Sequence, residues 1–158
     1  MQAIEYTKGT YVSLKRTGVA GLATMILFGA HLVSATGAAA SPTATVSKDG
    51  WCDKGEVCLY YNSNLYGGMF DVNYNVLNYG ADDFRCSLDG SGGRDICNGS
   101  GSNVWNNAAS VRNNSGCDVV IYYNSGYKGA KQEILRHTWA NLNATLKNNN
   151  ASHQFIRC

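Results

Sequence analysis

The stretch VCLYYNSNLYGG, residues 57–68, returns in altered form as VVIYYNSGYKG, residues 119–129. Each copy begins with β-branched and aromatic residues, which favour a strand, and continues into Asn, Ser and Gly, which favour a tight turn. A Tyr and a Gly then lead into further strand-forming sequence, so each copy predicts a β-hairpin. The repetition indicates that the same hairpin occurs twice in the fold.

Alternation within the two copies predicts which side chains are buried. Successive side chains of a strand point to opposite faces, so residues two apart share a face. The residues grouped in this way are Val57, Leu59 and Tyr61 in the first copy and Val119, Ile121 and Tyr123 in the second. We expect these two faces to meet in the core.

A second pattern follows each hairpin, since residues 106–110 and 148–152 both have the form Asn-Asn-x-x-Ser. Two paired signals in the same order indicate a repeated unit. Residues 85–103 fall inside the first unit only and are rich in Gly and Ser, so we interpret them as an insertion that forms a surface loop. No apolar period near 3.6 persists, so no helix of any length is predicted and the fold class is all-β.

Residues 1–40 have the features of a signal peptide. Lys15 and Arg16 precede an apolar run, and Ala38-Ala39-Ala40 provides the small residues that a signal peptidase accepts. A membrane anchor is the alternative, but the strongly apolar part is shorter than the ~20 residues that a span needs. We expect cleavage after Ala40, which gives a secreted, extracellular protein without membrane attachment. Residues 41–51 follow as a polar, flexible lead-in.

Charge excludes two classes of partner. The leader carries Lys8, Lys15 and Arg16 against Glu5, which accounts for the whole formal net charge of +2. The rest of the chain is therefore neutral. Nucleic-acid binding needs a clustered basic face, and binding to a membrane surface needs a basic amphipathic segment, so neither is expected.

All six cysteines follow the leader, at positions Cys52, Cys58, Cys86, Cys97, Cys117 and Cys158. An even number in an exported chain implies disulfides rather than thiol chemistry or metal binding. The sequence does not choose among the pairings, but we expect the sequential one because it closes local loops first. Each bridge contributes about 2–4 kcal/mol, mostly by restricting the unfolded chain. The predicted domain, residues 52–158, is therefore stabilised by disulfides.

These repeated units resemble the βγ-crystallin Greek key, whose pattern is aromatic-x-x-x-x-aromatic-x-Gly and later Asn/Asp-Asn/Asp-x-x-Ser. The matching residues are Tyr61, Tyr66 and Gly68 in the first copy and Tyr122, Tyr127 and Gly129 in the second. Face alternation instead equates Tyr123 with Tyr61 and makes the second hairpin one residue shorter. We prefer this alignment, because a slip of one residue would expose the core face.

More specifically, the short step from Cys52 to Cys58, which runs into Val-Cys-Leu-Tyr-Tyr-Asn, is similar to the secreted bacterial peptidase inhibitor family I36, typified by the Streptomyces metalloproteinase inhibitor. The resemblance implies two tandem Greek keys packed as a β-sandwich. It also implies inhibition of secreted metalloproteases of the thermolysin kind. We expect the inhibitor to be a monomer.

Such an inhibitor needs a rigid loop that enters the protease cleft in a substrate-like shape. The candidate is the loop of residues 87–96, with its base closed by Cys86 and Cys97. Its proposed contact residues are Leu88, Arg94 and Ile96. Three glycines near the tip argue against this choice, because a soft tip raises the entropic cost of binding.

The resemblance also suggests Ca²⁺ as the one candidate cofactor, because this turn supplies oxygen ligands in βγ-crystallins. The candidate ligands are Asn106, Asn107, Ser110, Asn148, Asn149 and Ser152. Ca²⁺ prefers a set that includes carboxylates, and every acidic position of the pattern is Asn here. The alternative is that these side chains only hold the turn backbones.

No enzymatic activity is expected. Only His137 and His153 follow the leader, and neither a nucleophile elbow nor a His-Glu-x-x-His helix is found. The alternative to an inhibitor is a secreted βγ-crystallin-type protein that binds Ca²⁺ or acts as an antimicrobial, toxin-like interaction protein. In that class, exposed aromatic side chains would contact carbohydrate.

Overall fold

The structure is a computed structural model that describes residues 47–90 and 95–158. The expected signal peptide, most of the lead-in and Arg94 lie outside the described residues. The strands are β1 (Val57–Tyr60), β2 (Met69–Val72), β3 (Ser110–Asn113), β4 (Asp118–Asn124), β5 (Lys128–Ile134), β6 (Thr138–Asn141) and β7 (Ser152–Ile156). Two short 3₁₀ turns, η1 (Ser63–Leu65) and η2 (Tyr79–Ala81), are the helical elements of the described residues.

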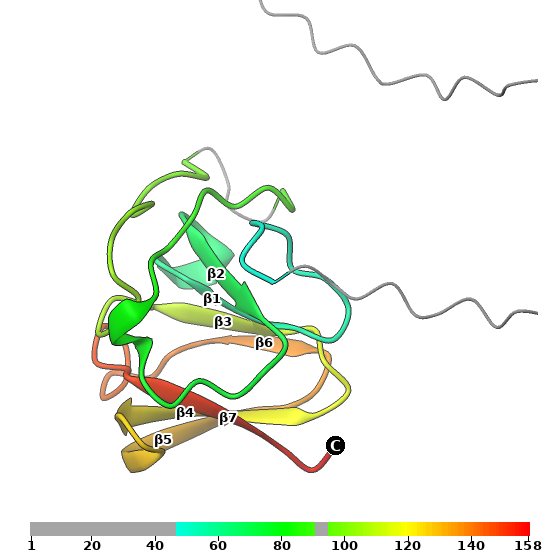
Figure 1. The fold of residues 1–158 in the computed structure, drawn as a ribbon, viewed down its shortest axis with the longest axis vertical. Helices are drawn as coiled ribbons and strands as arrows, with labels where there is room; N and C mark the ends of the chain where they lie inside the picture. The colour runs from blue at the N-terminus through cyan, green and yellow to red at the C-terminus, as the bar shows by residue number, and fades with distance from the viewer. Residues whose placement is uncertain (1–46, 91–94) are drawn as a thin grey trace, which may run out of the picture. The chain divides into compact units, whose positions relative to one another are not determined.

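The strands form two antiparallel sheets, one above the other in Figure 1. Sheet A has the order β2-β1-β3-β6, and sheet B has the order β5-β4-β7. Strand β6 belongs to the second half of the chain but pairs with β3 of the first half. Reciprocally, Val76 of the first half forms a bridge to His153 of β7. The two sheets confirm the predicted pair of tandem Greek keys packed as a β-sandwich, and the structure adds that each half lends a segment to the sheet of the other.

The apolar inner faces of the two sheets form the main core. The buried residues of this cluster include Val57, Leu59, Phe70, Tyr79, Phe84, Val111, Val119, Ile121, Ile134 and Leu146. Burial of this apolar surface is the main driving force for packing one sheet on the other. The alternation rule therefore identified the core residues of β1 and β4 correctly, with the exception of one tyrosine.

Tyr123 was predicted to be buried and is 42% exposed. Its counterpart Tyr61 packs against the core through an edge-to-face contact with Phe84, with ring centroids 5.6 Å apart. Phe84 directly precedes the long segment found only in the first key. Burial of Tyr61 thus depends on a ring that the hairpin itself does not supply.

The two hairpins have the same length, so the prediction of a shorter second hairpin is wrong. Tyr60 pairs with Ser110 and Tyr122 pairs with Ser152, which makes Tyr61 and Tyr123 equivalent, as expected. Beyond them, the left-handed residues that shape the turns also correspond, Leu65 with Tyr127 (φ 62° and 61°) and Gly67 with Gly129 (φ 81° in both). Backbone conformation therefore aligns Leu65 with Tyr127. The sequence motif had instead aligned the second aromatic residues, Tyr66 and Tyr127.

A serine hydroxyl closes each hairpin. Ser110 Oγ accepts a hydrogen bond from the Leu65 amide (3.0 Å) and donates one to the Asn62 carbonyl (2.6 Å). Ser152 Oγ makes the equivalent bonds with the Tyr127 amide (3.2 Å) and the Asn124 carbonyl (2.7 Å). The last residue of each Asn-Asn-x-x-Ser pattern thus fastens the first hairpin of its own key.

Three disulfides join Cys52 to Cys58, Cys86 to Cys97 and Cys117 to Cys158, which is the sequential pairing. The first staples the lead-in to β1, the second closes the base of the insertion, and the third ties the end of the chain to the start of β4. The first therefore joins a strand of sheet A to a segment outside it, whereas the other two join residues that lie outside the strands.

The lead-in differs from expectation over the residues that the structure describes. Residues 47–51 were predicted to be flexible, but they form a turn bonded to β2, and Gly50 is buried. The reason is a buried carboxylate, Asp71, which accepts hydrogen bonds from this segment. The polar composition of the lead-in gave no indication of that partner.

Removing a serine clamp should weaken the fold. We expect Ser110→Ala to lower the free energy of unfolding by about 1–3 kcal/mol, because the buried Leu65 amide loses its acceptor. Ser152→Ala should lower it by a similar amount. Urea denaturation measures both effects, and Ser100→Ala, at an exposed position, is the control. Equal stability of the Ser110→Ala and Ser100→Ala variants would contradict the clamp.

Candidate functional site

The insertion forms a loop beside β2, which is an edge strand of sheet A. Arg85 extends the pairing of β2 through reciprocal backbone hydrogen bonds with Met69 (2.7 and 2.8 Å), and the Cys86–Cys97 disulfide follows at once. Inside the disulfide, the Ser87 amide donates to the Ile96 carbonyl (2.9 Å). The base of the loop is therefore closed twice.

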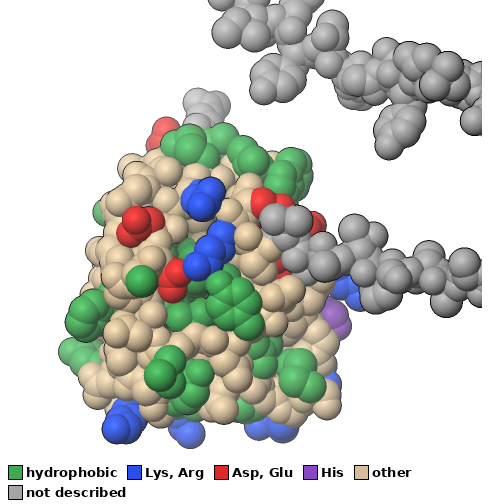
Figure 2. Space-filling model, in the orientation of Figure 1, with side chains coloured by type: hydrophobic (Ala, Val, Ile, Leu, Met, Phe, Trp, Pro, Cys, Tyr) green, Lys and Arg blue, Asp and Glu red, His purple; other side chains and the backbone are tan. Residues whose placement is uncertain are grey.

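Of the three predicted contact residues, the structure describes two. The Leu88 side chain is 47% exposed, and Ile96 is partly buried. In Figure 2, hydrophobic side chains gather along the upper edge of the molecule. The loop therefore presents apolar surface to solvent next to its closed base.

Asp89 anchors the loop on sheet A. Its carboxylate accepts hydrogen bonds from the Tyr60 hydroxyl (3.1 Å) and from Ser87 Oγ (2.9 Å), and it forms an ion pair with Arg112 (3.2 Å). Tyr60 is fully buried, so this contact reaches from the loop into the fold. Hydrogen bonds to a charged group are about twice as strong as neutral ones. No local sequence pattern indicates this role of Asp89, because its partners Tyr60 and Arg112 come from distant strands.

The surface beside this anchor carries an exposed tryptophan. Trp139 of β6 pairs with Arg112 of β3, so the two side chains leave sheet A on the same face. Trp139 is 53% exposed. This face thus offers a large aromatic side chain close to the loop anchor.

The two Asn-Asn-x-x-Ser turns meet at the junction of the keys. The Asn106 amide donates to the Asn150 carbonyl (2.8 Å), and the Asn148 amide donates to the Ala108 carbonyl (2.9 Å). Asn106 and Asn148 both have left-handed backbones, with φ of 61° and 57°. The turns therefore brace each other through reciprocal backbone bonds.

A polar cleft of about 220 Å³ lies against these turns. It is lined by Tyr61, Asn62, Ser63, Asn107, Ala109, Lys147 and Asn148. Two of the six predicted Ca²⁺ ligands, Asn107 and Asn148, therefore line the same cleft. The lining also includes a lysine, whose positive charge opposes cation binding.

The donor set does not fit Ca²⁺ well. The hydroxyls of Ser110 and Ser152 already hold the hairpins, and the Asn107 side-chain amide donates to the carbonyls of Asn103 (2.9 Å) and Trp105 (3.1 Å). The residues described contain no group of three or more His, Cys, Asp or Glu that could hold a metal ion. Ca²⁺ affinity rises with the number of charged ligands, so these contacts favour a turn-stabilising role.

His153 is likewise engaged within the fold. Its Nδ1 lies 2.9 Å from the Tyr79 hydroxyl and its Nε2 lies 2.9 Å from the Tyr74 carbonyl. Complete burial lowers the pKa of His153 to about 4, so the ring is neutral near pH 7. Both ring nitrogens stabilise the core, and neither is available for acid–base chemistry.

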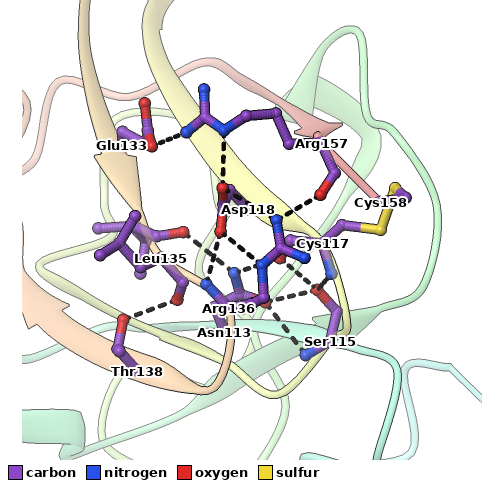
Figure 3. A network of polar contacts seen from close by, with 11 residues as sticks. Asn113, Ser115, Cys117, Asp118, Glu133, Leu135, Arg136, Thr138, Arg157 and Cys158 are labelled. Atoms are coloured by element: carbon purple, nitrogen blue, oxygen red, sulfur yellow. Dashed lines mark hydrogen bonds and ion pairs between the residues drawn. A yellow bond between two sulfur atoms is a disulfide. The ribbon is translucent and has the colours of Figure 1, made fainter.

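The C-terminus is held by a network that the sequence did not reveal. Asp118 lies between Arg136 and Arg157 in Figure 3, with ion-pair distances of 3.1 and 2.8 Å, and Arg157 also pairs with Glu133. The same corner contains the Cys117–Cys158 disulfide. The two guanidinium groups hold the pKa of Asp118 well below its usual range. The ion pairs and the disulfide together tie the C-terminal residues to β4 and β5.

Comparison with known proteins agrees with the fold and defines the class. The family model for "Peptidase inhibitor family I36" matches residues 47–134, which is more than half of the chain. The chain therefore belongs to peptidase inhibitor family I36. Its class is that of a protease inhibitor and not of an enzyme, as the hairpin and cysteine patterns predicted.

The structure is similar to a solved structure described as "Evolution of the eye lens beta-gamma-crystallin domain fold", with a TM-score of 0.52, 18% identity, and coverage of 69% of this chain and 92% of the other. This likeness supports the βγ-crystallin fold. Two further matches are a βγ-crystallin from an archaeon (TM-score 0.44, 15% identity, coverage 66% and 100%) and the N-terminal domain of protein S (0.42, 24%, 64% and 94%). No curated protein matches the chain. Within the described residues, no helix is long and apolar enough to cross a membrane.

Replacement of Asp118 should change acid stability. The lowered pKa means that ionised Asp118 stabilises the fold above about pH 4, its range in the unfolded chain, and that this contribution is lost as pH falls. We expect Asp118→Asn to lower the denaturant midpoint at pH 7, with a smaller difference from wild type at pH 2. Asp53→Asn, at an exposed position, is the control. A constant difference across this range would contradict the assignment.

The turn-stabilising role of the Asn-Asn-x-x-Ser residues predicts weak or absent Ca²⁺ binding. We expect isothermal titration with millimolar Ca²⁺ to release no heat of binding. Ca²⁺ should also leave the thermal midpoint unchanged, because a ligand of the folded state would raise it. Heat release that is lost in Asn107→Ala would instead establish a Ca²⁺ site in this cleft.

Proposed function

We propose that this protein inhibits secreted metalloproteases of the thermolysin kind, and that the loop of residues 87–96 is the segment that enters the protease cleft. The observation that supports this proposal is a loop with a closed and anchored base that presents an exposed leucine. The family establishes protease inhibition, and the target and the loop are our assignments.

Preorganisation is the physical reason for choosing this loop. A segment that orders only on binding loses conformational entropy, at about 0.5–1.5 kcal/mol for each immobilised flexible side chain and more for its backbone. Here the Cys86–Cys97 disulfide and the Asp89 contacts restrict the base before any protease arrives. The loop can then remain in place after binding, as a substrate-like inhibitor must.

The side chains give the loop its chemical character. Leu88 is the exposed apolar residue, and Ile96 lies beside the disulfide on the returning arm. Apolar side chains of this kind suit the cleft of a thermolysin-type protease. Arg94 remains a predicted contact.

We also propose that the inhibitor acts as a secreted monomer after removal of residues 1–40. Three disulfides fit an oxidising compartment. A protease that is itself secreted would meet the inhibitor there. The neutral mature chain fits recognition by shape and apolar contact rather than by long-range charge.

The proposal predicts inhibition that depends on Leu88. Protein recovered from the medium of a secreting host, with Ser41 as its first residue, should inhibit a thermolysin-type protease at a one-to-one ratio. Leu88→Asp should raise the inhibition constant about a hundredfold, the range of a buried hot-spot residue. The measurement is hydrolysis of a peptide substrate at increasing inhibitor concentration.

The matched control is Leu77→Asp, since Leu77 is 59% exposed and follows Val76, the bridge to sheet B. It should inhibit like the wild type. Full inhibition by Leu88→Asp would show that another loop makes the contact. Inhibition of a subtilisin-type serine protease alone would show that the target class is different.

A further inference from the structure

Two buried carboxylates lie side by side beneath the N-terminal segment of the domain. Glu56 and Asp71 are fully buried; Glu56 directly precedes β1, and Asp71 of β2 pairs with Cys58 of β1. The segment that covers them is residues 47–51, here called the strap. Carboxylates are rarely buried without strong partners, because desolvation of the charge is costly.

Asp71 holds the middle of the strap. Its Oδ2 accepts a hydrogen bond from the Asp49 amide (3.0 Å), and its Oδ1 accepts one from the Gly50 amide (3.2 Å). Its backbone carbonyl also accepts from the Lys48 amide (2.8 Å). One residue of β2 thus binds three consecutive amides of the strap.

Glu56 holds the two ends. Its carboxylate accepts from Ser47 Oγ (3.2 Å) at the start of the strap and from the Asp53 amide (2.8 Å) just beyond its end. The Cys52–Cys58 disulfide fastens the same end covalently. Burial raises the pKa of Glu56 to about 7 and also raises the pKa of Asp71. Both groups therefore reduce the stability of the fold when they are ionised.

The strap in turn supports the candidate inhibitory loop. The Gly50 carbonyl accepts a hydrogen bond from the Leu88 amide (2.7 Å). Gly50 has a left-handed backbone (φ 89°), and a Cβ there would lie 2.6 Å from the Cys86 carbonyl oxygen and 3.2 Å from Leu88 Cγ. The strap is therefore packed against both the disulfide base and the exposed leucine.

We propose that Asp71 is a positioning residue for inhibition, which acts through the strap to set the position of the Leu88 backbone. This inference rests on the proposed function, because it assumes that Leu88 contacts the protease. According to this proposal, the strap is part of the inhibitory unit. A carboxylate suits this role because its two oxygens can accept from two successive amides, which fixes the direction of the strap.

The test is Asp71→Asn. An amide side chain has one acceptor oxygen and places a donor against the second strap amide, so one hydrogen bond is lost and a repulsion is added. We expect hydrogen exchange of the Leu88 amide, followed by NMR, to become about tenfold faster or more. The inhibition constant should rise about tenfold, or ~1.4 kcal/mol. Gly50→Ala should produce both effects, because its Cβ displaces the strap while Asp71 is intact.

The matched control is Asp53→Asn, which removes the same charge from an exposed side chain beside the strap, keeps the backbone amide that Glu56 binds, and should leave exchange and inhibition unchanged. Wild-type exchange at Leu88 in both Asp71→Asn and Gly50→Ala would overturn the proposal. So would loss of near-UV circular dichroism in both variants, which would assign Asp71 to folding alone. If the wild type inhibits no protease, the proposed function fails, whereas the exchange measurement still decides whether Asp71 positions Leu88.

Discussion

Neither Greek key can cover its own apolar face, and the rest of the structure depends on that constraint. A single hairpin with one buried face is at best marginally stable in water, so its apolar side must pack against a second layer. The exchange of β6 and of the Val76 segment between the sheets satisfies this need and prevents the halves from separating independently. The resulting sandwich is a rigid support on which loops can be carried.

Polar groups determine where those loops lie. Ser110 and Ser152 fasten the hairpins, Asp118 closes the C-terminal corner, and Asp71 and Asp89 hold segments on the outer face of sheet A. Each of these side chains accepts hydrogen bonds from a segment distant in sequence. Buried acceptors are directional, so they define a position as well as an energy. In an inhibitor, that definition of position is what limits the entropic cost of binding.

The fold by itself does not establish the target. A solved structure with the βγ-crystallin fold is described in terms of the eye lens, whereas this chain belongs to a peptidase inhibitor family, so the shared fold does not define the function. In this chain the largest addition is the insertion between η2 and β3, which carries its own disulfide. Its attachment to sheet A through Asp89 and to the strap through Leu88 distinguishes it from a loop of merely tolerated length.

The sequence by itself determined the all-β class, the two hairpins and the buried faces of β1 and β4, and it favoured the sequential disulfide pairing without choosing it. These follow from local rules, namely alternation in strands, turn-forming residues and cysteines close along the chain. Only the tertiary structure decided that Tyr123 is exposed, that the second hairpin has full length, and that residues 47–51 are ordered on Asp71. It also decided the anchors of the candidate loop, Asp89 with Tyr60 and Arg112. Each of these depends on contacts between residues far apart in the chain, which appear only when the two keys have packed and which no local pattern encodes.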